Sequence, residues 1–239
     1  MIPVLFFCSL LLFSCIKDKE SERSYPRVTT GLVTNINTVG VTFNGSFLQS
    51  GNSEVIDHGF VFGPFASPNI QLSEIISLGV SKGNGSFTAT ANFGLESGKL
   101  YYVSAYARNK DKIFYGEYIR FISAGSAFPE ISAIEPEEGL RGDTVVIRGM
   151  YFSQLPGNNI VKFGDRDVSV ITASNTELSV LVPASTGKEY VDVFVTTAGQ
   201  TAQKISGFRY LKPEITGLSS GKGVIGDTIT MFSYFKKQP

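Results

Sequence analysis

Few residues of this chain could do chemistry, and the single histidine limits most of the possible sites. A Ser-His-Asp site or a histidine–metal site would have to include His58. Zinc needs several His or Cys ligands, and both cysteines, Cys8 and Cys15, lie in the N-terminal segment. The stretch "IDHGF" around His58 is typical of a strand, so we interpret His58 as a structural residue. We therefore expect no catalytic residue, no metal site and no cofactor.

Three further motifs have the residue types of ligand sites but lack the neighbouring residues that such sites require. "GDRD" at 164–167 offers two carboxylates, but no Asx-rich calcium loop continues it, which favours a hairpin turn. "SKGNGS" at 81–86 lacks the Lys-Ser/Thr ending of a phosphate-binding loop, so it also predicts a hairpin. Glu135, Glu137 and Glu138 lie in an expected turn between strands, and we interpret them as solvated.

The composition favours an all-β protein and argues against nucleic-acid binding. The chain has 239 residues, of which 21 are basic and 21 acidic, so its formal net charge is zero. No basic patch is visible that could neutralise phosphates, and we expect no nucleic-acid partner. The 19 Phe and 10 Tyr, with recurring short runs of Val, Ile and Thr, are typical of strands. The length suffices for two modest domains.

The N-terminus, "MIPVLFFCSLLLFSC", is an apolar run of signal-peptide length that is too short for a stable membrane span. Its end, Leu12-Phe13-Ser14-Cys15, resembles a bacterial lipobox. The resemblance implies a lipoprotein signal peptide at 1–14, acylation of Cys15, and attachment to the outer membrane through the acyl chains. The alternatives are an ordinary signal peptide or a hydrophobic N-terminal strand. The usual basic n-region is missing, which leaves the assigned start codon open.

The charged segment at 15–26 predicts a solvated tether. After Cys15 it reads "IKDKESERSYP", which cannot bury enough apolar surface to fold. It also resembles the export signal of Bacteroidetes surface lipoproteins, with Lys17, Asp18 and Glu20 carrying the resemblance. The resemblance implies exposure at the cell surface, while a plain tether is the alternative.

Residues 27–123 predict an antiparallel β-sandwich. "VGVTFNGSFL", "HGFVFG" and "LYYVSAYARN" have strand patterns and are separated by Gly-, Asn-, Ser- and Pro-containing turns. Leu95 lies six residues before Tyr101, a spacing that resembles the tyrosine corner of fibronectin type III domains. In those domains the Tyr hydroxyl bonds back to the connecting loop. Together with "YGEYIRF", these stretches resemble the fibronectin-III-like module of Bacteroidetes surface proteins.

An internal repeat follows a linker at 124–128. "PEISAIEPEEGLRGDTVV" begins at Pro129 and "PEITGLSSGKGVIGDTIT" at Pro213, an offset of 213 − 129 = 84 residues without a gap. The pattern resembles the opening of IPT/TIG immunoglobulin-like domains, which implies one such sandwich at 129–211 and the truncated start of a second at 212–239. Either the chain is cut or frameshifted, or the short second copy adds a strand to its neighbour.

The repeat also bears on the tripeptide Arg141-Gly142-Asp143, which is known as a cell-adhesion signal. Its counterpart in the second copy is Ile225-Gly226-Asp227, so Gly and Asp recur and Arg does not. A tight turn needs a residue that tolerates positive φ and a side chain that can bond its own backbone. We interpret the tripeptide as a turn rather than an adhesion signal.

The remaining candidate site is aromatic. Exposed rings stack on the apolar faces of sugars and also serve protein interfaces. The predicted set, with Tyr115 and Asn109 as neighbours, is Phe60, Phe62, Tyr102, Tyr106, Arg108 and Tyr118. The alternative is that these rings pack the sandwich or a domain interface, and the absence of Trp favours it.

The sequence therefore predicts a non-catalytic, cell-surface lipoprotein built of tandem antiparallel sandwiches. As a first hypothesis it captures extracellular polysaccharide for an uptake system, a role that the module resemblance implies. The alternative is an inert spacer, or a module that adheres to other surface proteins, presenting a further C-terminal domain.

Overall fold

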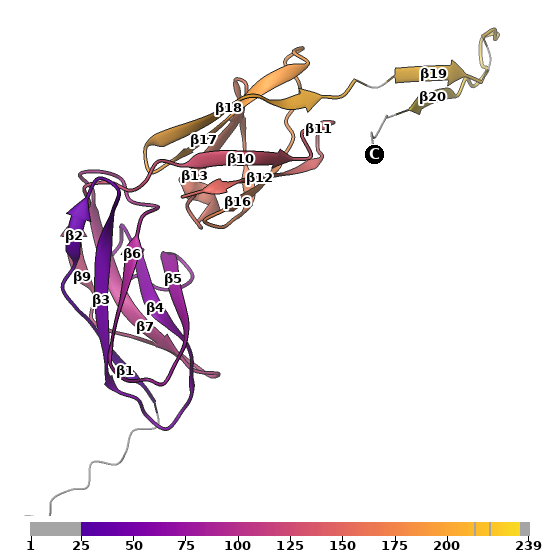
Figure 1. Ribbon diagram of the computed structural model, residues 1–239. Helices are drawn as coiled ribbons and strands as arrows, with labels where there is room; N and C mark the ends of the chain where they lie inside the picture. The colour runs from indigo at the N-terminus through magenta and orange to yellow at the C-terminus, as the bar shows by residue number, and fades with distance from the viewer. Residues whose placement is uncertain (1–24, 213, 220, 235–239) are drawn as a thin grey trace, which may run out of the picture.

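The computed structural model describes residues 25–212, 214–219 and 221–234 (Figure 1). This part of the chain contains strands and one short 3-10 helix but no α-helix, so the predicted all-β fold is confirmed. None of the described residues forms a helix long and apolar enough to cross a membrane. Cys15 and the charged segment as far as residue 24 lie outside the described residues, and lipidation stays a prediction.

The first sandwich consists of two antiparallel sheets. In one sheet β3 pairs with β1, β2 and β6; in the other the order is β5-β4-β7, and β8 and β9 both pair with β7. Its strands are β1 (Arg27–Thr30), β2 (Thr34–Asn37), β3 (Gly40–Gln49), β4 (Val55–Gly63), β5 (Glu74–Ser81), β6 (Ser86–Ala91), β7 (Leu100–Arg108), β8 (Ile113–Tyr115) and β9 (Ile119–Ile122).

Phenylalanines from facing strands fill the core of the first sandwich. Phe43 on β3 lies 5.6 Å from Phe60 and 5.3 Å from Phe62 on β4, measured between ring centroids, and all three side chains are fully buried. Val103 and Ala105 on β7 share this core. The alternation of these residues with outward-facing neighbours is what places them on the inner face.

The tyrosine corner predicted from the spacing of Leu95 and Tyr101 has the expected hydrogen bond. The Tyr101 hydroxyl accepts a hydrogen bond from the backbone N–H of Glu96 at 3.0 Å, and both Leu95 and Tyr101 are buried. The bond fixes the connection that leads into β7, the strand on which the predicted site residues Tyr102, Tyr106 and Arg108 lie.

The second sandwich also has two sheets, in the orders β10-β12-β16-β15 and β11-β18-β17-β13-β14. All pairs are antiparallel except β11 with β18. A separate core of aliphatic residues and phenylalanines, among them Ile147 and Phe208, lies between the sheets. Its elements are β10 (Glu130–Glu135), β11 (Glu138–Gly139), β12 (Thr144–Met150), η1 (Pro156–Asn158), β13 (Asn159–Phe163), β14 (Arg166–Val168), β15 (Val170–Ala173), β16 (Glu177–Leu181), β17 (Tyr190–Thr197) and β18 (Gln200–Tyr210).

The second copy of the repeat forms a hairpin of β19 (Glu214–Leu218) and β20 (Met231–Tyr234). Its register reproduces that of β10 and β12: Glu214 pairs with Tyr234 as Glu130 pairs with Met150, and the register shift falls at the equivalent place. The hairpin is a separate two-stranded sheet, so the alternative that it adds a strand to its neighbour is wrong.

Of the two predicted hairpin turns, one is confirmed and one is wrong. Gly164 and Asp165 connect β13 to its partner β14, and Asp167 on β14 pairs with Lys162 at 3.2 Å. Residues 81–86 connect β5 to β6, which belong to different sheets of the first sandwich. A glycine-rich turn can join two strands within a sheet or lead from one sheet to the other, and the local sequence does not distinguish them.

Candidate functional site

His58 has a structural role, as the sequence predicts. It is buried on β4, and its Nδ1 lies 2.7 Å from the carbonyl oxygen of Gly79. Because a carbonyl only accepts, this ring nitrogen donates. The ring also contacts Phe87 edge-on, with centroids 4.9 Å apart. In the described part of the chain, no group of three or more His, Cys, Asp and Glu side chains could hold a metal ion.

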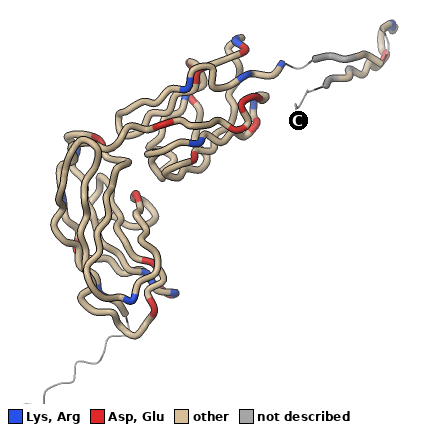
Figure 2. The backbone as a smooth tube through the Cα atoms, in the orientation of Figure 1, with Lys and Arg blue, Asp and Glu red and all other residues tan. Residues whose placement is uncertain are grey.

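Glu135 and Glu137 are exposed, as the interpretation of solvated residues predicts, whereas the Glu138 side chain is 27% exposed, and Glu135 and Glu138 each form an ion pair. Glu135 pairs with Arg148 at 2.8 Å, and Glu138 pairs with Arg209 at 3.2 Å. Both pairs connect neighbouring strands of the second sandwich. Figure 2 shows basic and acidic residues interspersed over both sandwiches rather than segregated by sign.

Three residues of the predicted aromatic surface are buried, so the prediction that they belong to a binding surface was wrong. Phe60 and Phe62 are fully buried in the core of the first sandwich, and Tyr106 is 1% exposed. Phe60 and Phe62 face the core because they pair with Ala105 and Val103, the inward-facing residues of β7. Tyr106 does lie on the opposite face, as predicted, but that face is covered.

On β8, the strand paired with Tyr106, Tyr115 contacts the connection between β4 and β5, residues 64–73. The backbone N–H of Ile70 in this connection donates to the Tyr115 hydroxyl at 3.2 Å, which holds the connection against the sheet. The Tyr106 hydroxyl donates to Asp57 Oδ2 at 2.7 Å. Burial raises the pKa of Tyr106, and the nearby Asp57 carboxylate raises it further. The side chain is therefore a neutral, structural donor.

Arg108 and Asn109 are not brought to the remaining tyrosines. Arg108 is exposed at the end of β7, six residues from Tyr102, which is about 20 Å along a strand. Asn109 is buried in the following turn, where its Oδ1 accepts hydrogen bonds from the backbone N–H groups of Asp111 and Lys112. Neither side chain can contribute to a common site with Tyr102.

Three tyrosines remain together at the edge of the second sheet of the first sandwich. Tyr102 and Tyr118 form an edge-to-face pair with ring centroids 5.5 Å apart and planes 76° apart. Tyr118 is 45% exposed, and Tyr115, which precedes it by three residues, is 40% exposed. These rings form the part of the predicted aromatic surface on which another ring or an apolar sugar face could stack.

A break between β8 and β9 places Tyr115 and Tyr118 on the surface. At the break, the backbone N–H of Gly116 donates to the Ala105 carbonyl at 2.8 Å, and Ser104 Oγ donates to the Gly116 carbonyl at 2.5 Å. A Cβ on Gly116 would lie 2.9 Å from the backbone nitrogen and Oγ1 of Thr30 on β1. Glycine is thus required where β1 approaches the break.

Tyr115 and Tyr118 border a hollow of about 240 Å³, which we call the tyrosine hollow. Besides the rings, its lining includes Ser67, Asn69 and Glu117, which carry a hydroxyl, an amide and a carboxylate, whereas the Ser104 hydroxyl is buried and bonded to Gly116. Such groups can donate and accept hydrogen bonds to hydroxyls, while the rings offer apolar contact. Its lining residues are Ser67, Pro68, Asn69, Ser104, Tyr115, Gly116, Glu117 and Tyr118. Sequence reasoning missed Ser67 and Asn69, because only the fold brings the 64–73 connection to the tyrosines.

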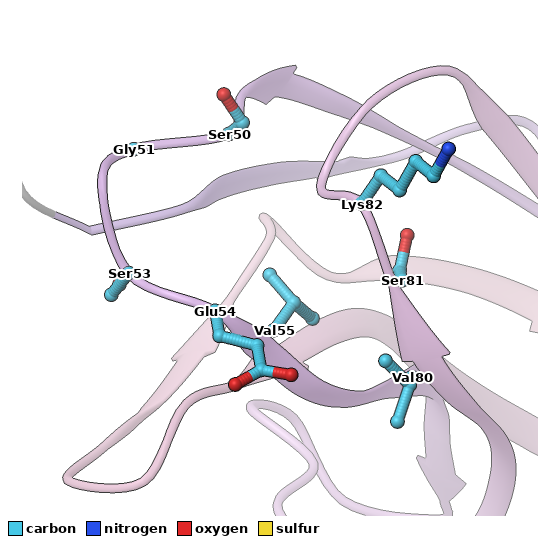
Figure 3. A pocket seen from close by; sticks show the side chains of 8 residues that line it. All are labelled: Ser50, Gly51, Ser53, Glu54, Val55, Val80, Ser81 and Lys82. Atoms are coloured by element: carbon cyan, nitrogen blue, oxygen red, sulfur yellow. The ribbon is translucent and has the colours of Figure 1, made fainter.

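A second hollow lies between the connection at 50–54 and the end of β5 (Figure 3). Figure 3 shows the Glu54 carboxylate and the Lys82 amine pointing in different directions around an open space. The eight residues that line it include no aromatic ring. It offers scattered polar groups without a stacking surface, and the tyrosine hollow is the better candidate site.

Comparison with protein families identifies the second sandwich. Residues 129–210 match the model of the IPT/TIG domain family, which confirms the immunoglobulin-like module predicted from the repeat. No curated protein matches the sequence significantly.

Several solved structures from Bacteroides are similar to parts of the chain. SGBP-B from a complex xyloglucan utilization locus of Bacteroides uniformis aligns with 81% of this chain and 54% of its own, at 19% identity and a TM-score of 0.33. An auxiliary nutrient binding protein from Bacteroides thetaiotaomicron aligns with 37% of this chain and 22% of its own, at 20% identity and a TM-score of 0.33. An auxiliary nutrient binding protein from Bacteroides ovatus aligns with 38% of this chain and 23% of its own, at 20% identity and a TM-score of 0.32. The chain thus spans about half or less of the length of these three structures.

Proposed function

We propose that the protein is a non-catalytic, lipid-anchored cell-surface protein that contacts extracellular polysaccharide through the tyrosine hollow. The observation that carries the proposal is the Tyr102–Tyr118 ring pair beside a hollow with hydroxyl, amide and carboxylate groups. Sugars present both apolar ring faces and hydroxyls, so this combination suits them. Acyl chains on Cys15 would hold the protein at the outer membrane, and the segment at 15–26 would lift it from the bilayer.

Within this proposal the first sandwich, 27–123, is a fibronectin-III-like module. Its support is the division of strands between the two sheets and the bond from Glu96 to Tyr101. The second sandwich and the hairpin at 214–234 continue the chain away from the module that bears the hollow (Figure 1).

Retention of the protein on immobilised polysaccharides tests the proposal. Wild type should be retarded by at least one polysaccharide, and Tyr118→Ala and Tyr102→Ala should each weaken the retention about tenfold, since one stacked ring contributes about 1 kcal/mol or more. Tyr190→Ala is the control, because Tyr190 is also exposed but lies on the second sandwich. Equal retention of all four proteins would place glycan binding elsewhere.

The second candidate function is that of a spacer. Its specific support is the hairpin at 214–234, whose register copies that of β10 and β12 and so continues a tandem arrangement of sandwiches. If wild type is retained by no polysaccharide while its fold is intact, the spacer becomes the better proposal.

A further inference from the structure

The two sandwiches meet at a buried carboxylate. Glu74 is the first residue of β5 in the first sandwich, and it is 2% exposed. Both of its carboxylate oxygens are bonded by the second sandwich. Ser153 Oγ donates to Oε1, and the backbone N–H of Gln154 donates to Oε2 at 2.9 Å. A buried carboxylate is tolerated when it is hydrogen-bonded in this way.

Beside it, the Gln154 side chain takes the place of a strand. Its Oε1 accepts from the backbone N–H of Ile75 at 3.0 Å, and its Nε2 donates to the Ile75 carbonyl at 3.0 Å. Because β5 is the last strand of its sheet, these two backbone groups have no strand partner on that side. One residue of the second sandwich thus completes two backbone hydrogen bonds of the first.

The segment that supplies these groups is itself held in place. Asn159 Oδ1 accepts from the Ser153 backbone N–H at 3.0 Å, and Asn159 Nδ2 donates to the Ser153 carbonyl at 2.8 Å. Asn159 is buried, so these bonds are shielded from water. Tyr151, two residues earlier, packs against the core of the first sandwich.

The connection between the sandwiches, predicted as a linker at 124–128, is bonded on both sides. Ser126 is 1% exposed, and its Oγ donates to the Leu95 carbonyl of the first sandwich at 3.0 Å. Its own carbonyl accepts from Gln200 Nε2 of the second sandwich at 3.3 Å. A connection held in this way cannot act as a free hinge.

We infer that the two sandwiches move as one rigid, bent body, held by Glu74 and Gln154. Relative motion is the ordinary expectation for consecutive domains, because their interfaces are small and polar. Here separation would break the bonds of a buried carboxylate and of an edge-strand backbone at the same time. Removing one partner of a buried charge is far more costly than losing a surface contact. The bend visible in Figure 1 is therefore a fixed property of the pair.

Distance distributions between two spin labels test the inference. The labels are attached to cysteines introduced at Thr88 in the first sandwich and Ser169 in the second, both exposed, in the full chain with Cys8→Ser and Cys15→Ser. The starting protein should give one narrow distance. Gln154→Ala and Glu74→Ala should each broaden the distribution, and Gln71→Ala, an exposed residue of the preceding connection, should leave it narrow.

Two outcomes would overturn the inference. One is a broad distribution already in the starting protein, which would make the pair flexible. The other is an unchanged narrow distribution in Gln154→Ala, whose fold is checked by circular dichroism and by the unfolding midpoint. Gln154→Ala keeps the test decisive even where Glu74→Ala fails to fold, since Gln154 lies outside both cores.

Discussion

Asp143 and Asp227 close the same turn 84 residues apart (227 − 143 = 84). Each Oδ2 accepts a hydrogen bond from the backbone N–H three residues earlier, that of Leu140 or of Val224, at 2.8 Å in both copies. The glycine before each Asp has a φ of +91° in one turn and +103° in the other, a conformation that favours glycine. The recurring Gly-Asp of the adhesion-like tripeptide is thus explained by the turn.

Asp143→Ala should destabilise the second sandwich by about 1 kcal/mol, because it removes the side-chain bond that closes this turn. Arg141→Ala should change the free energy of unfolding by no more than about 0.5 kcal/mol, since Arg141 is exposed. Urea unfolding of both variants checks the difference. A larger loss in Arg141→Ala would mean that the arginine, not the turn, is what matters at this position.

Phe60→Ala should cost about 3–5 kcal/mol of stability, because it empties the centre of the first core. The control is Phe65→Ala, since Phe65 is 75% exposed on the connection after β4. Thermal or urea unfolding distinguishes the two. If Phe60→Ala leaves stability intact and instead weakens ligand retention, the original assignment of Phe60 to a binding surface would have been correct.

Tyr106→Phe should lower stability by about 1–3 kcal/mol, because it leaves the Asp57 carboxylate without its bond from the buried hydroxyl. Tyr118→Phe should be neutral, since its ring is exposed and retained. Both variants should keep any polysaccharide retention, as neither removes a ring. Loss of retention in Tyr106→Phe with normal stability would contradict a purely structural role.

Gly149→Ala should destabilise the second sandwich by about 1–3 kcal/mol or more. A Cβ at Gly149 would overlap the backbone carbonyl oxygen of Glu130 on the paired strand β10, and the Phe152 ring. Gly157→Ala is the matched control, because nothing lies within 4 Å of a Cβ there. Equal unfolding midpoints for the two variants would show that β10 and β12 can separate to admit a methyl group.

Lowering the pH should increase the contribution that Glu74 makes to the free energy of unfolding. Burial raises the pKa of Glu74 above its ordinary value of 4.5, and hydrogen bonds from Ser153, Gln154 and Asn158 lower it in part. With the folded pKa above the unfolded one, this contribution is fully present below about pH 4.5 and is lost as the pH rises through the folded pKa.

The measurement is the free energy of unfolding of wild type and of Glu74→Gln, which does not titrate at this position, at a series of pH values. The advantage of wild type over Glu74→Gln should shrink as the pH rises above the ordinary pKa of 4.5 and through the folded pKa. Parallel pH profiles for the two proteins would show that Glu74 has the same pKa folded and unfolded.

Local sequence was sufficient for some elements and not for others. The alternation in β7 identified Tyr101, Val103 and Ala105 as one face, and the repeat located the second sandwich. Both signals are short-range patterns that a strand or a turn imposes on its own residues. The burial of Tyr106 could not be derived in this way, because its partner Asp57 lies 49 residues away in the sequence and only the fold brings the two together.

The candidate site shows the same division. Tyr102 and Tyr118 were found because aromatic residues on an outer face are visible in the sequence. Ser67 and Asn69 were missed because only the folded chain places the 64–73 connection beside β8 and β9. The partnership of Glu74 with Gln154 spans 80 residues (154 − 74 = 80) and has no local signature at all.

The placement of Gln154 against Ile75 also bears on the tendency of the protein to aggregate. An uncovered outermost strand exposes backbone donors and acceptors that can recruit a strand from another molecule, a common route to aggregation. Under the proposed lipid anchor, copies of the protein would meet at high local concentration. By occupying both backbone groups of Ile75, one glutamine amide closes the start of β5 to such intermolecular pairing.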